Sequence, residues 1–155
     1  MKIDRRILDI NSEEDKKVLR DKISAFDFDK FSKSDINNLI KTMREVMDEA
    51  DGVGLAANQI GLDMAVFVVG FDGKFYAIFN PEIIKASKEK EGSEEGCLSI
   101  PGHADIAYRH EKITLIGYDK NQKKIKIKAW GLLARIFQHE IDHLNGKLFI
   151  DRVKK

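Results

Sequence analysis

The chain is short of three things that would each indicate a particular class of protein: cysteine, proline and long apolar runs. A single cysteine excludes an intrachain disulfide, so Cys97 is either a small buried apolar residue or a group with a chemical role. The only prolines, Pro81 and Pro101, mark no linker, and no repeat or low-complexity tract is present. We therefore expect residues 1–155 to form one continuous domain.

Membrane and secretion signals are also lacking. No apolar run approaches the roughly 20 residues of a membrane helix, and the first residues lack the apolar core of a signal peptide. We expect a cytoplasmic protein without membrane contact. The 27 Lys and Arg against 26 Asp and Glu leave a net charge of +1, which produces no general attraction to polyanions. Direct binding of nucleic acid is not expected.

Two amphipathic helices stand out. Apolar residues recur every three or four positions from Ile36 to Ala50, which predicts a helix capped by Ser32 or Ser34 and ended by Gly52. A second helical pattern covers residues 132–144, with Gly146 placed as its stop.

Alternating patterns predict two antiparallel hairpins, one from residues 64–69 and 75–79, the other from 113–118 and 125–128. Helices and strands occur in blocks without regular alternation, which favours an α+β fold. Residues 1–33 are ambiguous. The stretch 27–31 alternates like an extended segment, and 13–20 is compatible with a helical turn or a loop.

The strongest chemical signal is His139-Glu140-Ile141-Asp142-His143, inside the second helix. Residues four apart share one helical face, so both imidazoles can reach one metal ion, while Glu140 can act on a ligand of that ion without coordinating it. Two histidines at this spacing also occur by chance on exposed helix faces. Apolar neighbours favour burial here, and buried histidines need partners.

Cys97 is the candidate third ligand. A catalytic metal site keeps three protein ligands and an open position, whereas a structural zinc site uses four. Gly96 allows close backbone approach and Pro101 stiffens the exit of the segment, as suits a loop that presents one side chain. A lone cysteine is also commonly an inert core residue, so this alternative stays open for the cysteine by itself.

A third segment, Gly-Val-Gly-Leu-Ala-Ala-Asn-Gln at residues 52–59, directly follows the first helix. Its glycines expose backbone groups that can pair with an extended ligand, and Gln59 offers an amide donor. A glycine-rich helix exit without a ligand is the simpler interpretation of the segment alone. No Gly-Lys-Ser/Thr follows, so it does not resemble a phosphate loop.

Together the three segments resemble the signature motifs of peptide deformylases: residues 52–59, Glu-Gly-Cys-Leu-Ser at 95–99 and His-Glu-Ile-Asp-His at 139–143. The order agrees, no motif position is missing, and the resemblance covers roughly residues 34–151. It implies antiparallel β-sheets packed around a central metal-binding helix. It also implies hydrolysis of the N-formyl group from the formyl-methionine of nascent polypeptides, with release of formate.

The resemblance further implies site roles. Cys97, His139 and His143 would hold one divalent ion, usually Fe²⁺ in the family, with Zn²⁺, Ni²⁺ or Co²⁺ as alternatives; the thiolate and imidazole donors alone suggest zinc. Glu140 would move the proton of the attacking water. Gln59 and the backbone N–H of Leu98 would donate to the oxyanion.

Substrate contacts follow from the same resemblance. Val53, Leu132 and Ile136 would line the methionine pocket, and the peptide would extend beside Val53 and Gly54 through backbone hydrogen bonds. We expect N-formylmethionyl peptides as partners.

Three departures from the family pattern are visible. Residues 15–20 keep the Leu and Arg of a Pro-x-x-x-Leu-Arg stretch without its proline, and Ala104 stands where some members carry an arginine. The sequence shows no C-terminal helix after His143, so we expect only transient ribosome contact.

Two alternative functions remain. His139 to His143 also fits the H-E-x-x-H motif of zinc peptidases, although Cys97 is an unusual ligand there. The other alternative is a deformylase-like binding protein without activity. The presence of both Gln59 and Glu140 argues against it.

Overall fold

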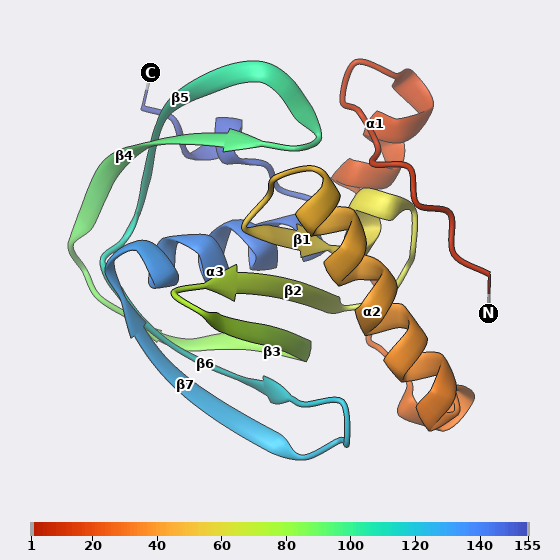
Figure 1. Ribbon diagram of the computed structural model, residues 1–155. Coiled ribbons are helices and arrows are strands. Elements are labelled where there is room, and N and C mark those ends of the chain that lie inside the picture. Colours follow the sequence, from red (N-terminus) through yellow and green to blue (C-terminus); the bar gives the residue numbers. More distant parts are fainter. Residues whose placement is uncertain (1, 155) are drawn as a thin grey trace.

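The structure is a computed structural model that describes residues 2–154. Two β-sheets surround one long helix, and a second long helix lies against the opposite face of the larger sheet (Figure 1). Within residues 2–154 no helix is long and apolar enough to cross a membrane. The helices are α1 (Glu13–Arg20), α2 (Lys33–Glu49) and α3 (Gly131–Leu144), with 3₁₀ turns at Phe28–Lys30, Ala57–Ile60 and Phe149–Arg152. The strands are β1 (Gly54–Ala56), β2 (Val66–Phe71), β3 (Lys74–Ala86), β4 (Lys90–Cys97), β5 (Ile100–His110), β6 (Lys112–Tyr118) and β7 (Lys124–Trp130).

The larger sheet has the strand order β1-β2-β3-β6-β7, and every neighbouring pair is antiparallel. Both expected hairpins are present, as β2–β3 and β6–β7, and β3 runs further than expected, to Ala86. The smaller sheet is the β4–β5 hairpin, which sequence patterns did not reveal. The α+β class and the packing of antiparallel sheets around a central helix are thus confirmed.

Helix α2 begins where its sequence predicts. Ser32 accepts a hydrogen bond from the backbone of Asp35, whose carboxylate accepts one from the backbone of Ser32, closing a capping box. The end differs from expectation: the helix stops at Glu49, and Asp51 takes the left-handed conformation, with φ of 55°. Gly52 is therefore not the residue that ends the helix, although its N–H still bonds to the carbonyl of Met47.

Helix α3 ends at Leu144, and Gly146, the expected stop, follows it with a φ of +73°, in the glycine-favoured region. Any side chain there would collide with the backbone of Arg20. The ambiguous N-terminal segment contains α1, capped by Ser12, and a 3₁₀ turn over 28–30 capped by Asp27. The segment 27–31, left open by the sequence, thus contains a turn although its residues alternate like an extended segment, and the Asp27 side chain accepts a hydrogen bond from the backbone of Asp29 in that turn.

Two apolar clusters share the larger sheet. On one face, α2 packs against side chains of β2 and β3 such as Val66, Val68 and Phe79. On the other face, α3 packs through Ile136, Phe137 and neighbouring residues. Helix α3 is thus enclosed by the larger sheet on one side and the β4–β5 hairpin on the other, which fixes the position of its histidines.

Candidate active site

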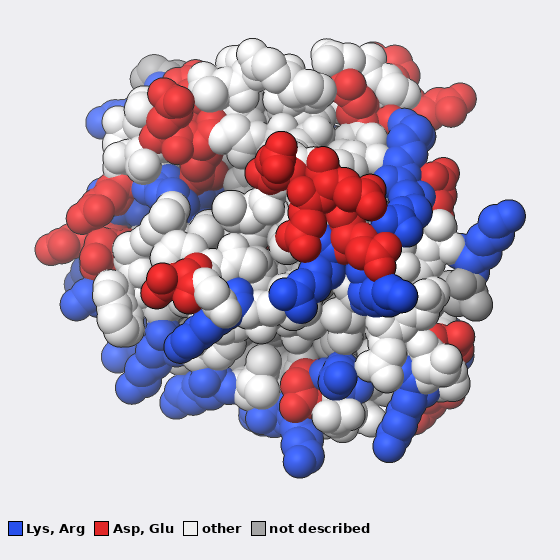
Figure 2. All heavy atoms as spheres, viewed as in Figure 1, with Lys and Arg blue, Asp and Glu red and all other residues white. Residues whose placement is uncertain are grey.

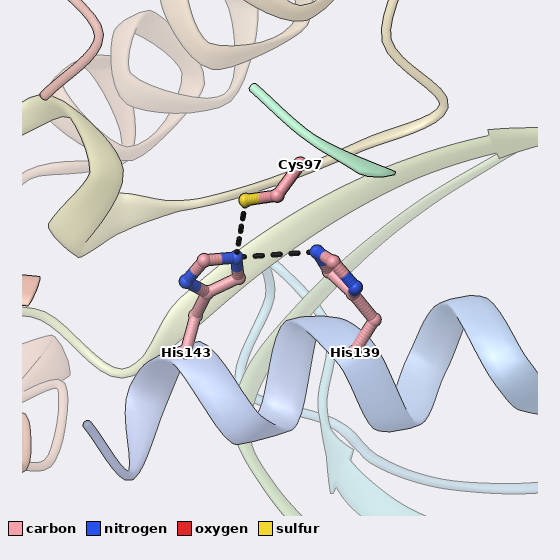
Figure 3. A group of neighbouring side chains, drawn as sticks. All are labelled: Cys97, His139 and His143. Atoms are coloured by element: carbon pink, nitrogen blue, oxygen red, sulfur yellow. Dashed lines mark hydrogen bonds between the residues drawn. The ribbon is translucent and has the colours of Figure 1, made fainter. Parts of the chain in front are cut away.

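Three potential metal ligands converge from two elements. His139 and His143 lie one turn apart on α3, and Cys97 reaches them from the end of β4 (Figure 3). The Cys97 Sγ lies 3.3 Å from His143 Nε2, which lies 3.2 Å from His139 Nε2. All three donor atoms are within 4.8 Å of one another.

This geometry fits a shared ion. Tetrahedral bonds of about 2.0–2.1 Å to nitrogen and about 2.3 Å to sulfur place the donor atoms roughly 3.3–3.6 Å apart. The observed separations of 3.2 and 3.3 Å are close to those values. One thiolate and two imidazoles suit zinc or another transition metal. Three ligands leave a coordination position for water or substrate, as in catalytic sites.

Glu140 is buried beside this group but is not part of it. One of its carboxylate oxygens, Oε1, is buried and has no hydrogen-bond partner within residues 2–154. The carboxylate also lies against Gly54, where any side chain would collide with it. Burial raises the pKa of Glu140 to about 7, although the nearby positive charge of His139 opposes the increase. The glycine at position 54 therefore makes room for a buried carboxyl group that faces the cleft.

The two histidines have different surroundings. Burial lowers the pKa of His143 well below its usual value, and repulsion from His139 lowers it further. His139 Nδ1 lies 2.9 Å from the Glu95 carboxylate. Burial by itself would lower the pKa of His139, but the Cys97 and Glu95 side chains raise it to about 10. Because the Glu95 carboxylate contacts the Nδ1 atom of His139, the Nε2 atom of the same ring points toward the other two potential ligands.

A buried ionic network fixes Glu95. Arg109 donates to its carboxylate from Nε and a terminal nitrogen, at 2.7 and 3.0 Å, and Arg135 donates at 2.6 Å. Arg109 also donates to Asp142, which Arg152 contacts through two nitrogens. Burial would raise the pKa of Glu95, yet the bonds from His139 and Arg109 hold it at about 2. The network ties β4, β5 and α3 together directly behind the ligands.

Sequence reasoning did not assign a role to this network. Glu95 lies within the motif at 95–99, two positions before Cys97, and alternate residues of a strand share a face. That spacing could have indicated a supporting role for Glu95. Arg109 and Arg135 carry no such local signal, because their partners are 14 and 40 residues away from them.

A cleft of about 650 Å³ opens beside the ligands. Val53 and Leu132 are exposed along it, at 56% and 59%, while Ile136 is 7% exposed. Of the residues selected from sequence, all but the buried His143 line this cleft: Val53, Gly54, Gln59, Cys97, Leu98, Leu132, Ile136, His139 and Glu140. The structure thus brings the three motifs to one place.

Gln59 lies next to the sulfur ligand. Its Nε2 is 3.7 Å from Cys97 Sγ and donates to Ser99 Oγ at 3.1 Å, and its Oε1 accepts from the backbone of Ala56 at 2.9 Å. The amide orientation is therefore fixed at both ends. Neighbouring Asn58 donates to the carbonyl of His143 at 2.6 Å, which links this segment to the end of α3.

Comparison with known proteins shows similarity to peptide deformylases in sequence and fold. Residues 6–155 match the family model described as polypeptide deformylase. A peptide deformylase of Halothermothrix orenii is 48% identical over 118 residues, covering 75% of this chain and 76% of that protein. One of Natranaerobius thermophilus is 44% identical over 121 residues, covering 77% and 78%. The crystal structure of peptide deformylase from Thermotoga maritima has 36% identity, a TM-score of 0.88 and 97% coverage of both chains. By its sequence, its fold and its Cys-His-His group, this chain belongs to the polypeptide deformylase family.

Proposed function

We propose that this protein removes the N-formyl group from the N-terminal formyl-methionine of nascent polypeptides and releases formate. One observation carries the proposal: a Cys-His-His metal group and the separately buried Glu140 share a cleft in a chain of this family. Such an arrangement suits hydrolysis of a small amide, in which water is the nucleophile and an amine is the leaving group.

Cys97, His139 and His143 would hold the ion, which when bound supplies Lewis acidity for activating water and polarising the formyl carbonyl. Glu140 takes the proton of the attacking water on its free carboxylate oxygen and later gives it to the departing amine. Its exclusion from the ligand group leaves it available for this proton transfer. His139 keeps its orientation through Glu95.

Gln59 Nε2 and the backbone N–H of Leu98 stabilise the oxyanion of the tetrahedral intermediate. Gln59 is held beside Cys97, and Leu98 follows Cys97 in the chain, so both donors lie next to the reacting centre. Losing one such donor typically costs about 3 kcal/mol of transition-state stabilisation.

The methionine side chain occupies the apolar part of the cleft, between Val53, Leu132 and Ile136. The peptide backbone runs along Val53 and Gly54 and pairs with them as an added strand. Backbone pairing is insensitive to side-chain identity, so many formylated N-termini are substrates. Because these substrates are nascent chains, we place the protein in the cytoplasm, in transient contact with the ribosome.

The experiment compares three peptides with protein that has been loaded with metal without oxygen: formyl-Met-Ala-Ser, acetyl-Met-Ala-Ser and unblocked Met-Ala-Ser. Formate and intact peptide mass are measured. We expect formate and intact Met-Ala-Ser from the first peptide only. Cleavage of a peptide bond would indicate a peptidase, and full metal content without formate would indicate an inactive binding protein.

For the native metal we propose Fe²⁺, supported by the resemblance to the family. The donor set also accepts zinc, nickel and cobalt. Iron next to a thiolate is exposed to oxidation, whereas zinc has no redox chemistry of its own. The iron form should therefore start more active and decay faster in air than the zinc or nickel form. Equal decay of all three forms would argue against iron-linked inactivation.

A further inference from the structure

A second groove lies on the sheet face opposite to α3. It runs over the end of β3, the start of β6 and the end of β7. Its volume is about 610 Å³. We call it the lysine groove, and its charged and aromatic lining consists of Lys85, Lys112, Lys126, Lys128 and Trp130.

Strand register explains why these side chains gather there. In β7, Ile125, Ile127 and Ala129 pack into the cluster that contains α3, so Lys126 and Lys128 must point to the other face. Lys112 is paired with Trp130, and Lys85 lies two strands away, opposite Thr114. Helix α2 covers β2 and part of β3 on this face, which leaves the end next to β7 open.

The described lining of the groove carries positive charge only; the nearest acidic residue that the strand register places on this face is Glu82, opposite Ile116. All four lysines are exposed, and none makes an ion pair with another residue in the part of the chain that the structure describes. No Asp or Glu belongs to the described lining. Figure 2 shows Lys and Arg side chains along the lower left edge, where β7 runs in Figure 1, and acidic side chains gathered higher up. A net charge of +1 therefore conceals a strongly uneven distribution.

We propose that the lysine groove binds the phosphate backbone of structured RNA. Lysines at alternate positions of a strand repeat about every 6.8 Å, so they present a row of cations to a row of phosphates. Trp130, 69% exposed at the end of this row, offers a face on which an unpaired base can stack. This interaction differs from the expectation drawn from net charge alone.

The shape of the surface favours RNA over a membrane. The lysines line a hollow, which can receive a protruding phosphate ridge, whereas a bilayer is contacted by a convex face with several apolar side chains inserted. Only Ile84 and Trp130 are large exposed apolar residues in this lining. The groove also leaves the metal cleft free, since α3 lies across the sheet from it. If the substrate is a nascent chain, which rests on the proposed function, the RNA of the ribosome is the relevant partner.

The test uses a fluorescently labelled RNA hairpin and a pair of charge-matched variants. Lys126→Glu with Lys128→Glu changes the groove, and Lys16→Glu with Lys17→Glu changes exposed lysines of α1, at the far side of the molecule. Each double variant lowers the net charge by four, from +1 to −3, so any difference between them reports position. Fluorescence anisotropy is measured at about 50 and about 200 mM salt.

We expect the groove variant to lose at least about tenfold in RNA affinity and to show a weaker salt dependence, because two phosphate contacts are lost. The α1 variant should stay within about twofold of the unmodified protein, and Trp130→Ala should weaken binding to a hairpin with an unpaired loop more than binding to a fully paired duplex. Formate release from a short formyl peptide should be unchanged in all variants, which verifies folding and separates this test from that of the proposed function. If the double Glu variant of the groove does not fold, Lys126→Gln with Lys128→Gln replaces it, and Lys16→Gln with Lys17→Gln becomes its charge-matched control.

Equal losses in both double variants would overturn the proposal, because binding would then follow net charge alone. So would absence of RNA binding at low salt. Binding to vesicles of anionic lipid without binding to RNA would assign the groove to a membrane surface instead.

Discussion

Charged residues are used in opposite ways at the metal site and around the N-terminal segment. Behind the ligands, Arg109 is 2% exposed and contacts two carboxylates, Glu95 and Asp142. Near the N-terminus, Arg5 is 45% exposed and contacts Glu45 and Glu49 at 3.0 and 3.2 Å. The buried and the exposed ion pairs therefore have similar N–O distances but differ in their access to water. The buried pairs hold one geometry, because any broken contact leaves a charge without water, whereas the exposed pairs are readily replaced by solvent.

The largest effect should come from Glu140, a buried carboxylate whose Oε1 has no hydrogen-bond partner within residues 2–154. Glu140→Gln keeps the size of the side chain but cannot accept the water proton, so formate release should fall about 10²- to 10⁴-fold. Metal content should stay at the unmodified level, because Glu140 is not among the ligands. Glu14→Gln, an exposed change on α1, serves as the control. Near-normal activity in Glu140→Gln would refute its assignment as the proton carrier.

The next largest effect should follow from breaking the ionic network. Arg109→Met preserves much of the apolar stem but leaves Glu95 and Asp142 with fewer donors, and loss of one buried partner typically costs about 3–5 kcal/mol. Urea denaturation of the metal-free protein gives the free energy of unfolding. A loss below about 1 kcal/mol would mean that Arg135 and Arg152 already satisfy these carboxylates.

Asp15 is intermediate between the two regions, since it is buried but belongs to the N-terminal segment. Its carboxylate accepts two bonds from Arg6 and one from the backbone of Asp9. These bonds, the Arg6 side chain first, lower its pKa from 3.8 to about 2. A lowered folded-state pKa stabilises the protein above pH 3.8, and this contribution is lost as the pH falls through about 2.

Asp15→Asn should therefore reduce thermal stability at pH 7, and the difference from the unmodified protein should shrink below pH 3.8. The measurement is the melting temperature of both metal-free proteins across this pH range. A difference that does not change with pH would show that the site acts through packing rather than charge.

The smallest effect is expected for Arg5→Met, the exposed counterpart of Arg109→Met. Surface ion pairs contribute about 0–1 kcal/mol, and salt screens them. The free energy of unfolding should change by less than about 1 kcal/mol, with any change vanishing at high salt. A loss comparable to that of Arg109→Met would remove the distinction between the two regions.

The same contrast explains what the sequence could predict. Helices α2 and α3 follow from apolar periodicity, and the start of α2 and the stop of α3 follow from local residues. The β6–β7 hairpin follows from alternation in 124–130. The β4–β5 hairpin could not be recognised, because residues 90–96 are mostly polar and exposed, and neither strand buries one continuous face.

The motifs predicted the ligands and the cleft because each carries its chemistry locally. The network of Glu95, Arg109 and Asp142 was not predictable, since pairing between residues on different elements depends on the finished fold. The left-handed Asp51 was missed for a different reason: a neighbouring glycine is the more common choice at a helix end.

The central claim is that Cys97, His139 and His143 together hold one ion that is required for deformylation. The most direct measurement titrates metal-free protein with Fe²⁺ or Ni²⁺ without oxygen while recording bound metal and formate release from formyl-Met-Ala-Ser. The account predicts that activity rises with bound metal and stops rising at one ion per chain, and that Cys97→Ala neither retains the ion nor releases formate. Full metal content in Cys97→Ala, or formate release by the metal-free protein, would contradict it.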